Sequence, residues 1–214
     1  MVIYLKYVKT VMNTILTTSN MENQFYTVVG GQKEDRILKY SSKFSILLLN
    51  RGGKFYRDDF LDDISALDFA EILCMDGPGT SYDFDVRTKK YPRVKFLLLK
   101  DEMTIGEKIN LGINEARARF ILVIWSDMKI HNSLNLTRIV KKTENDNTIC
   151  MVPLLKTRKM EQIPSMHLPI IVKRKFKVMP WNMIKDSMKS IYPFDYCGIY
   201  NKEKLHYLKV LTEK

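Results

Sequence analysis

The chain has 214 residues, of which 45% are hydrophobic and 28% charged, so one globular domain with extensions is expected and wholesale disorder is excluded. No apolar run reaches the roughly 18–20 residues that a membrane-spanning helix needs. The formal net charge of +11 favours an anionic partner, which leaves nucleic acid, anionic lipid and phosphorylated ligands open. The runs KTRK at 156–159 and KRKFK at 173–177 carry much of the positive excess.

The three cysteines, Cys74, Cys150 and Cys197, are odd in number and include no CxxC pair. Lys6 and Lys9 interrupt the apolar residues at the N-terminus, which disfavours a signal peptide. Together these features predict reduced thiols and a cytoplasmic location, and they disfavour a zinc site.

Residues 1–20 have apolar side chains at helical spacing and are predicted to form an N-terminal helix. The helix either packs on the domain, which is the preferred interpretation, or lies at a lipid surface as an interfacial helix. Residues 21–43 are polar and mixed, and they are predicted to be a linker or an irregular cover.

Buried strands and amphipathic helices alternate from residue 44 onward. Short apolar runs predict strands at 44–50, 71–75, 94–99, 119–125 and 148–153, and helical spacing predicts helices at 58–69, 104–118 and 133–144. Thr104 and Glu107 form a capping-box pattern at the start of the second helix, and the turn-rich segment 76–85 is predicted to be a loop. This order predicts an α/β fold with a mostly parallel central sheet and helices on both faces.

The pattern weakens after residue 153, where four prolines interrupt residues 154–193. The run 171–178 is interpreted as an edge strand, and 180–191 as a short helix with Pro180 in its first turn. Residues 196–200 and 201–211 are then predicted to form a strand followed by a helix.

Polar residues follow three of the predicted parallel strands, at the edge where such sheets bind ligands. They are Asn50, Arg51, Asp76, Ser126 and Asp127. The patterns GxxxxGK[ST], GxGxxG and GxSxG are missing, which disfavours a P-loop nucleotidase, a classical dinucleotide fold and the common hydrolase elbow.

Oxygen ligands at that edge suit a hard divalent cation, which needs one or two protein carboxylates besides phosphate oxygens. Asp127 is the candidate metal ligand, and Asp76 is the candidate contact to a base or ribose. The plainer alternatives are that Asp127 solvates a strand end and that Asp76 forms the turn before Gly-Pro.

Three stretches, SILLLNRGG, EILCMDGPGTS and GEKINLGINEARARFILVIWSDM, resemble in this order the opening half of the family-two glycosyltransferases of the GT-A fold. Gly106, Asn110, Gly112 and Ala116 match the family's helix, and Asp127 matches the last acid of its D-x-D motif. The resemblance covers roughly residues 43–155.

The resemblance implies hexosyl transfer from a nucleotide-diphosphate sugar, assisted by Mn2+ or Mg2+, to a saccharide, lipid or protein acceptor in cell-envelope polysaccharide synthesis. It implies a nucleotide-sugar-binding half at 44–155 and a partial acceptor-side half at 156–214. It names no catalytic residue, assigns metal binding to Asp127, and assigns nucleotide binding to Asn50, Arg51, Asp76, Asn110 and Ser126.

Departures from the family keep other functions open. Trp125 stands where the family has its first acid, and an indole can only donate a hydrogen bond. The acidic motif that supplies the base does not follow YCGIYNKEKL, since neither Asp195 nor Glu203 matches its position. One alternative is therefore a truncated or degenerate GT-A domain that binds a nucleotide or a partner without turnover. A basic nucleic-acid-binding domain is the second alternative, disfavoured because no recognised module is present.

Overall fold

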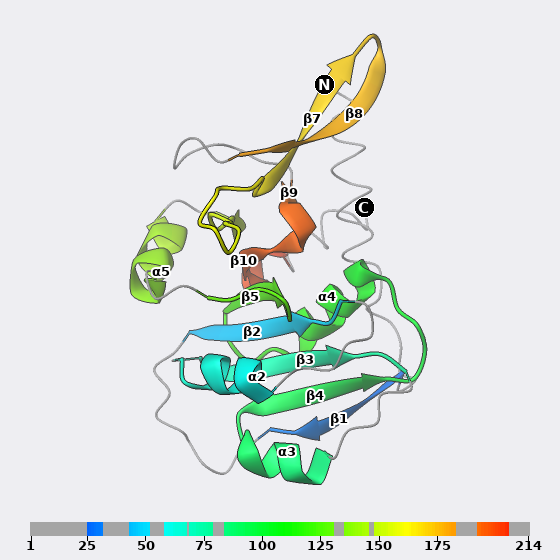
Figure 1. The fold of residues 1–214 in the computed structure, drawn as a ribbon, viewed down its shortest axis with the longest axis vertical. Helices are drawn as coiled ribbons and strands as arrows, with labels where there is room; N and C mark the ends of the chain where they lie inside the picture. The colour runs from blue at the N-terminus through cyan, green and yellow to red at the C-terminus, as the bar shows by residue number, and fades with distance from the viewer. Residues whose placement is uncertain are drawn as a thin grey trace.

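The computed structural model describes residues 25–31, 43–51, 58–67, 69–78, 84–130, 135–145, 148–182 and 192–205. Its centre is a seven-stranded sheet with the strand order β1-β4-β3-β2-β5-β10-β6 (Figure 1). The strands are β1 (Tyr26–Gly30), β2 (Phe44–Leu49), β3 (Glu71–Asp76), β4 (Val94–Leu99), β5 (Phe120–Trp125), β6 (Cys150–Met151) and β10 (Gly198–Asn201). The helices are α2 (Asp58–Ser65), α3 (Phe84–Lys90), α4 (Ile105–Glu115) and α5 (Leu136–Asn145).

The four middle strands are parallel, and β1, β10 and β6 pair antiparallel with their neighbours. Every residue of β2, β3 and β5 is buried, as expected of strands that are covered on both faces and therefore read as continuous apolar runs. The predicted α/β fold with a mostly parallel central sheet is confirmed.

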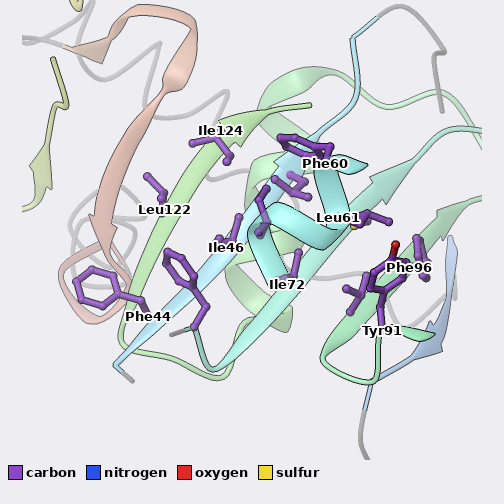
Figure 2. Packing of buried hydrophobic residues seen from close by; sticks show 14 of the residues in the cluster. Phe44, Ile46, Phe60, Leu61, Ile72, Tyr91, Phe96, Leu122 and Ile124 are labelled. Atoms are coloured by element: carbon purple, nitrogen blue, oxygen red, sulfur yellow. The ribbon is translucent and has the colours of Figure 1, made fainter. Parts of the chain in front are cut away.

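The two faces of the sheet carry separate hydrophobic clusters, because successive strand residues point to opposite sides. Ile46 and Leu48 of β2 belong to the cluster that α2 and α5 cover, part of which is shown in Figure 2. Leu47 and Leu49 belong to the cluster on the other face, which α4 covers. Helices therefore lie on both faces, as predicted.

The strand order changes side between β2 and β5, because the strands that follow β2 in the chain lie first on one side of β2 and then on the other. From β2 the chain moves outward through β3 to β4, with α2 between the first two strands and α3 between the next two. It then returns along α4 on the opposite face to β5, which pairs with the other edge of β2. Such a switch point leaves a crevice beyond the carboxyl ends of the two strands, where ligands of open α/β sheets bind.

Several predictions of local structure were wrong or only partly correct. Residues 26–30, inside the predicted linker, form β1, which pairs with β4 from Tyr26↔Leu99 to Gly30↔Lys95. The end of the predicted loop at 76–85 enters α3, a helix too short to show helical periodicity. The helix predicted at 104–118 is confirmed over Ile105–Glu115 with its capping box, whereas the strand predicted at 148–153 is only two residues long.

A second sheet has the order β8-β7-β9, built from β7 (Met166–Val172), β8 (Lys175–Trp181) and β9 (Tyr192–Pro193). The run 171–178, interpreted as one edge strand, is instead the tip of a hairpin that turns at Lys173 and Arg174. Pro180 lies in β8, so the helix predicted from it does not begin there, and residues 183–191 lie outside the described part. The predicted N-terminal helix at 1–20 lies outside it too.

Gly112 gives α4 its close approach to β2. A Cβ added there would lie 2.6 Å from Cδ2 of Leu47 and closer still to Cδ1. Leu47 is fully buried and has little room to retreat. We expect Gly112→Ala to lower the free energy of unfolding by about 1–2 kcal/mol, despite alanine's higher helix propensity, because overpacking outweighs it.

Urea unfolding followed by circular dichroism measures this change. The matched control is Asn114→Ala at an exposed position of the same helix, which should leave stability nearly unchanged or slightly raised. A Gly112→Ala protein more stable than the wild type would show that close packing is not the role of this glycine.

Candidate functional site

Four polar residues meet at the switch point. Asn50 and Arg51 follow β2, and Ser126 and Asp127 follow β5, whose last residue Trp125 is in register with Leu49. The backbone N–H of Ser126 donates to the Leu49 carbonyl at 2.9 Å, and its Oγ donates to Oδ1 of Asn50 at 3.4 Å. The structure thus brings together four of the six predicted site residues.

Arg51 is the centre of this group. Its Nη2 lies 2.9 Å from Oδ2 of Asp195, and its Nε lies 3.8 Å from Oδ2 of Asp127. The guanidinium carbon is 4.5 Å from the ring centroid of Trp125, a cation–π contact. Arg51 therefore has partners on three sides while its side chain remains 47% exposed.

Trp125 has a role that its position in the sequence did not reveal. The indole, only 7% exposed, donates from Nε1 to the backbone carbonyl of Asp195 at 2.8 Å. Asp195 has φ 50° and ψ 27°, a left-handed conformation that aspartate tolerates better than most residues. The tryptophan thus helps to hold a carboxylate beside Arg51 that comes from another part of the chain.

The pairing of Asp195 with Arg51 and the indole contact are features of this site that could not be predicted from the sequence. Asp195 is 144 positions from Arg51, so no local spacing points to their pairing. It lies in the 3-10 helix η1 (Phe194–Tyr196), directly after β9. Because Gly198 of β10 pairs with Val123 of β5, the residues just before β10 lie beside the carboxyl end of β5 and so at the switch point.

Asp76, the last residue of β3, is fully buried one strand away from Asn50. Among the described residues no donor meets either carboxylate oxygen at hydrogen-bonding geometry. Burial raises the pKa of Asp76 to about 7, although the nearby amide of Asn50 and the charges of Arg87 and Lys108 favour the ionised form. A buried carboxyl without donors is costly, and such groups are concentrated where a ligand completes their bonding.

Asn110 is also buried, in α4, and within the described part of the chain its Nδ2 has no hydrogen-bond partner. No hydrogen bond described by the structure joins it to the other five predicted residues. Its assignment to nucleotide binding stays a prediction.

Asp127 fits a minimal metal-binding role. Its side chain is 58% exposed, and its contact to Arg51 is long. Across the described ranges no group of three or more His, Cys, Asp or Glu side chains could hold a metal ion by itself. Mg2+ binds through one or two carboxylates together with substrate phosphates, so Asp127 could serve as a ligand once a diphosphate is bound.

A pocket of about 210 Å³ lies elsewhere, between α2 and the segment after β5. Its lining contains none of the strand-end residues and consists of Phe60, Asp63, Ile64, Leu67, Lys129 and Ile130. Two of its charged groups neutralise each other, since Lys129 Nζ lies 3.3 Å from Oδ2 of Asp63. The chemistry therefore points to the strand ends rather than to this pocket.

No protein-family model matches the sequence, and no curated protein matches it. Among solved structures, S. aureus TarS 1–349 superposes with a TM-score of 0.52 at 16% identity, over 79% of this chain and 50% of that one. HddC from Yersinia pseudotuberculosis superposes less well, with a TM-score of 0.47 at 10% identity over 77% of this chain and 79% of that one. A candidate glucose-1-phosphate thymidylyltransferase from Bacillus anthracis, in complex with a sucrose, has a TM-score of 0.46 at 15% identity over 78% of this chain and 74% of that one.

The chain spans about half the length of the TarS structure. At such low identity the likeness establishes the fold, and the predicted GT-A type of fold is confirmed.

Proposed function

We propose that this chain binds a nucleotide-diphosphate sugar at the carboxyl ends of β2 and β5 and transfers the sugar to a saccharide or lipid-linked acceptor. The observation that carries the proposal is the arrangement at the switch point. There Arg51 and Asp127 lie beside each other, and the buried acid Asp76 lies one strand away. A GT-A fold is compatible with this function.

In this proposal the base and ribose of the nucleotide lie near Asp76. A ligand N–H or O–H would give this carboxyl the donor that the described residues do not provide. Arg51 would face the diphosphate, since the planar guanidinium group suits phosphate oxygens. Arg87 and Lys108 add positive charge on the side of Asp76. Asn50 and Ser126, joined by a hydrogen bond of 3.4 Å, lie at the same strand ends.

Asp127 would hold Mn2+ or Mg2+ in this site, and the bound ion would supply charge neutralisation for the departing diphosphate. Asp195 serves as a positioning residue, because its carboxylate is paired with Arg51 at 2.9 Å. No residue is assigned as the base that activates the acceptor hydroxyl.

A second candidate function is nucleotide binding without turnover. It is favoured by Trp125, whose indole stands where a second acid would otherwise face the metal, and by the engagement of both nearby carboxylates with Arg51. Hydrolysis or transfer of the donor sugar by the purified chain would decide between the two functions.

Titration of UDP-sugars and GDP-sugars by calorimetry, with and without Mn2+, tests nucleotide binding. We expect Mn2+ to strengthen binding, and Asp127→Ala to remove most of that gain, about 10-fold or more, because a metal ligand is lost. The matched control is Asp63→Ala, an acid of similar exposure on α2 that should leave binding unchanged. If no nucleotide binds with or without Mn2+, both candidate functions are wrong.

A further inference from the structure

The hairpin of β7 and β8 turns through two basic residues in strained conformations. Lys173 and Arg174 have φ values of 49° and 61°, both in the left-handed region. A two-residue turn of this kind favours Asn-Gly, because long L side chains are strained there. Strained backbone conformations are concentrated at functional positions. Lys173 and Arg174 in this turn therefore indicate that their charged side chains have a function.

The tip combines cations with exposed apolar side chains. Lys173, Arg174, Lys175 and Lys177 are all exposed, and in the part of the chain that the structure describes no ion pair joins them to an acid. Ile171 is 68% exposed and Val172 is 37% exposed. We call these six residues the hairpin tip.

Apolar side chains lie on both faces of the hairpin tip, whereas Lys175 and Lys177 share the face of Val172. Ile171 is opposite Phe176 and Val172 is opposite Lys175, and directly opposed residues of an antiparallel pair point to the same face. Ile171 and Val172 are adjacent in β7 and so point to opposite faces. The apolar side chains therefore flank the cationic turn on both sides.

The hairpin is rooted at the candidate site. Its base pairs with β9 through Met166↔Pro193, and the ring of His167 stacks on Phe194 with centroids 4.9 Å apart. Phe194 precedes Asp195, the partner of Arg51. Figure 1 shows the hairpin projecting away from the central sheet, so the tip extends outward while its base adjoins the switch point.

We propose that the hairpin tip binds an anionic lipid bilayer, with its cations at the headgroups and Ile171 and Val172 in the interface. Basic residues beside exposed apolar ones are the combination that interfacial segments use. Single-stranded nucleic acid would call for exposed aromatic side chains for base stacking, whereas the aromatic Phe176 beside the turn is half-buried. The bilayer contact stands on the hairpin alone, while its use in reaching a lipid-linked acceptor rests on the proposed function.

The decisive variant is Lys173→Asn with Arg174→Gly. It removes two charges and installs the favoured turn pair, so the hairpin should fold at least as well as in the wild type. Co-sedimentation of the whole chain with mixed phosphatidylcholine and phosphatidylglycerol vesicles should show partitioning lowered roughly 10- to 30-fold, at about fivefold for each lost cation. A second variant, Ile171→Ser, should lower it about tenfold through the lost apolar contact.

The matched control, Lys89→Gln with Lys141→Gln, removes the same charge from exposed positions of α3 and α5 and should change partitioning less than about twofold. Equal binding to pure phosphatidylcholine, no binding to anionic vesicles, or undiminished binding by the turn variant would overturn the proposal. Single-stranded RNA bound through the same two residues, without vesicle binding, would overturn it and assign the tip to nucleic acid.

Nucleotide titration of the same proteins separates this inference from the proposed function. The turn variant should keep the nucleotide affinity of the wild type, because neither residue contacts the strand-end site. If the wild-type chain binds nucleotide but not vesicles, only the membrane inference is rejected. If it binds vesicles but not nucleotide, only the nucleotide site is rejected.

Discussion

Glu71→Ala is expected to lower the free energy of unfolding by about 3–5 kcal/mol, because it leaves a buried charge without its partner. Glu71 opens β3 and is 4% exposed, and its Oε2 lies 2.6 Å from Nζ of Lys95, which is itself 8% exposed. Ser45 Oγ donates to its other oxygen at 2.8 Å, and the backbone N–H of Arg117 donates to the same oxygen. Removing the carboxylate breaks all three interactions at once.

Chemical denaturation at neutral pH measures this effect, and two variants test the reason for it. Glu71→Leu combined with Lys95→Met removes both charges and should recover most of the lost stability, since paired apolar replacements of buried ion pairs are often neutral or better. Glu144→Ala removes an exposed acid that lies 3.2 Å from Arg119 and should change stability by less than about 1 kcal/mol. A Glu71→Ala loss as small as that of Glu144→Ala would contradict the buried-pair interpretation.

The central strands could be predicted from the sequence because burial on both faces leaves a continuous apolar run. The same runs located their carboxyl ends, and with them Asn50, Arg51, Asp76 and Asp127. The edge strand β1 could not be found this way, since none of its five residues is buried: two are half-buried and three are exposed. A short edge strand has no face that must be apolar throughout.

The rest of the site depends on contacts between distant segments. Glu71 lay within a predicted strand, but nothing in EILCM shows that Lys95 pairs with it. Asp195 approaches Arg51 because η1 leads into β10, which pairs with β5 from Gly198↔Val123 onward. The turn of the β7–β8 hairpin could not be predicted either, because KRKFK contains neither the glycine nor the asparagine that is typical of such turns. Residues whose role is set by tertiary contact leave no periodic pattern.

In contrast to Glu71→Ala, the substitution Asp76→Asn should raise the free energy of unfolding at pH 8, by up to about 4 kcal/mol, and should change this free energy little at pH 4. Burial raises the pKa of Asp76 from 3.8 to about 7, so the folded state binds a proton that the unfolded state has already lost over that interval. The stability that this proton confers is complete below pH 4 and falls as pH rises, until it is gone above pH 7. Asparagine has no charge to bury, so its stability should not show this decline.

Thermal unfolding of both proteins between pH 4 and pH 8 measures the difference, with the exposed Asp101→Asn as the control that should show none. Nucleotide titration of the same variant supplies the second half of the test. If Asp76 accepts a ligand donor in its ionised form, wild-type affinity should rise as the pH passes through about 7 and level off above it, and Asp76→Asn should lose affinity at least about 10-fold. Stability gained together with binding lost is the expected signature of a residue kept for function rather than for folding. If the variant gains stability and its nucleotide affinity equals that of the wild type, Asp76 is a destabilising buried carboxyl that does not contact the ligand. The base or ribose would then have to bind elsewhere along the strand ends.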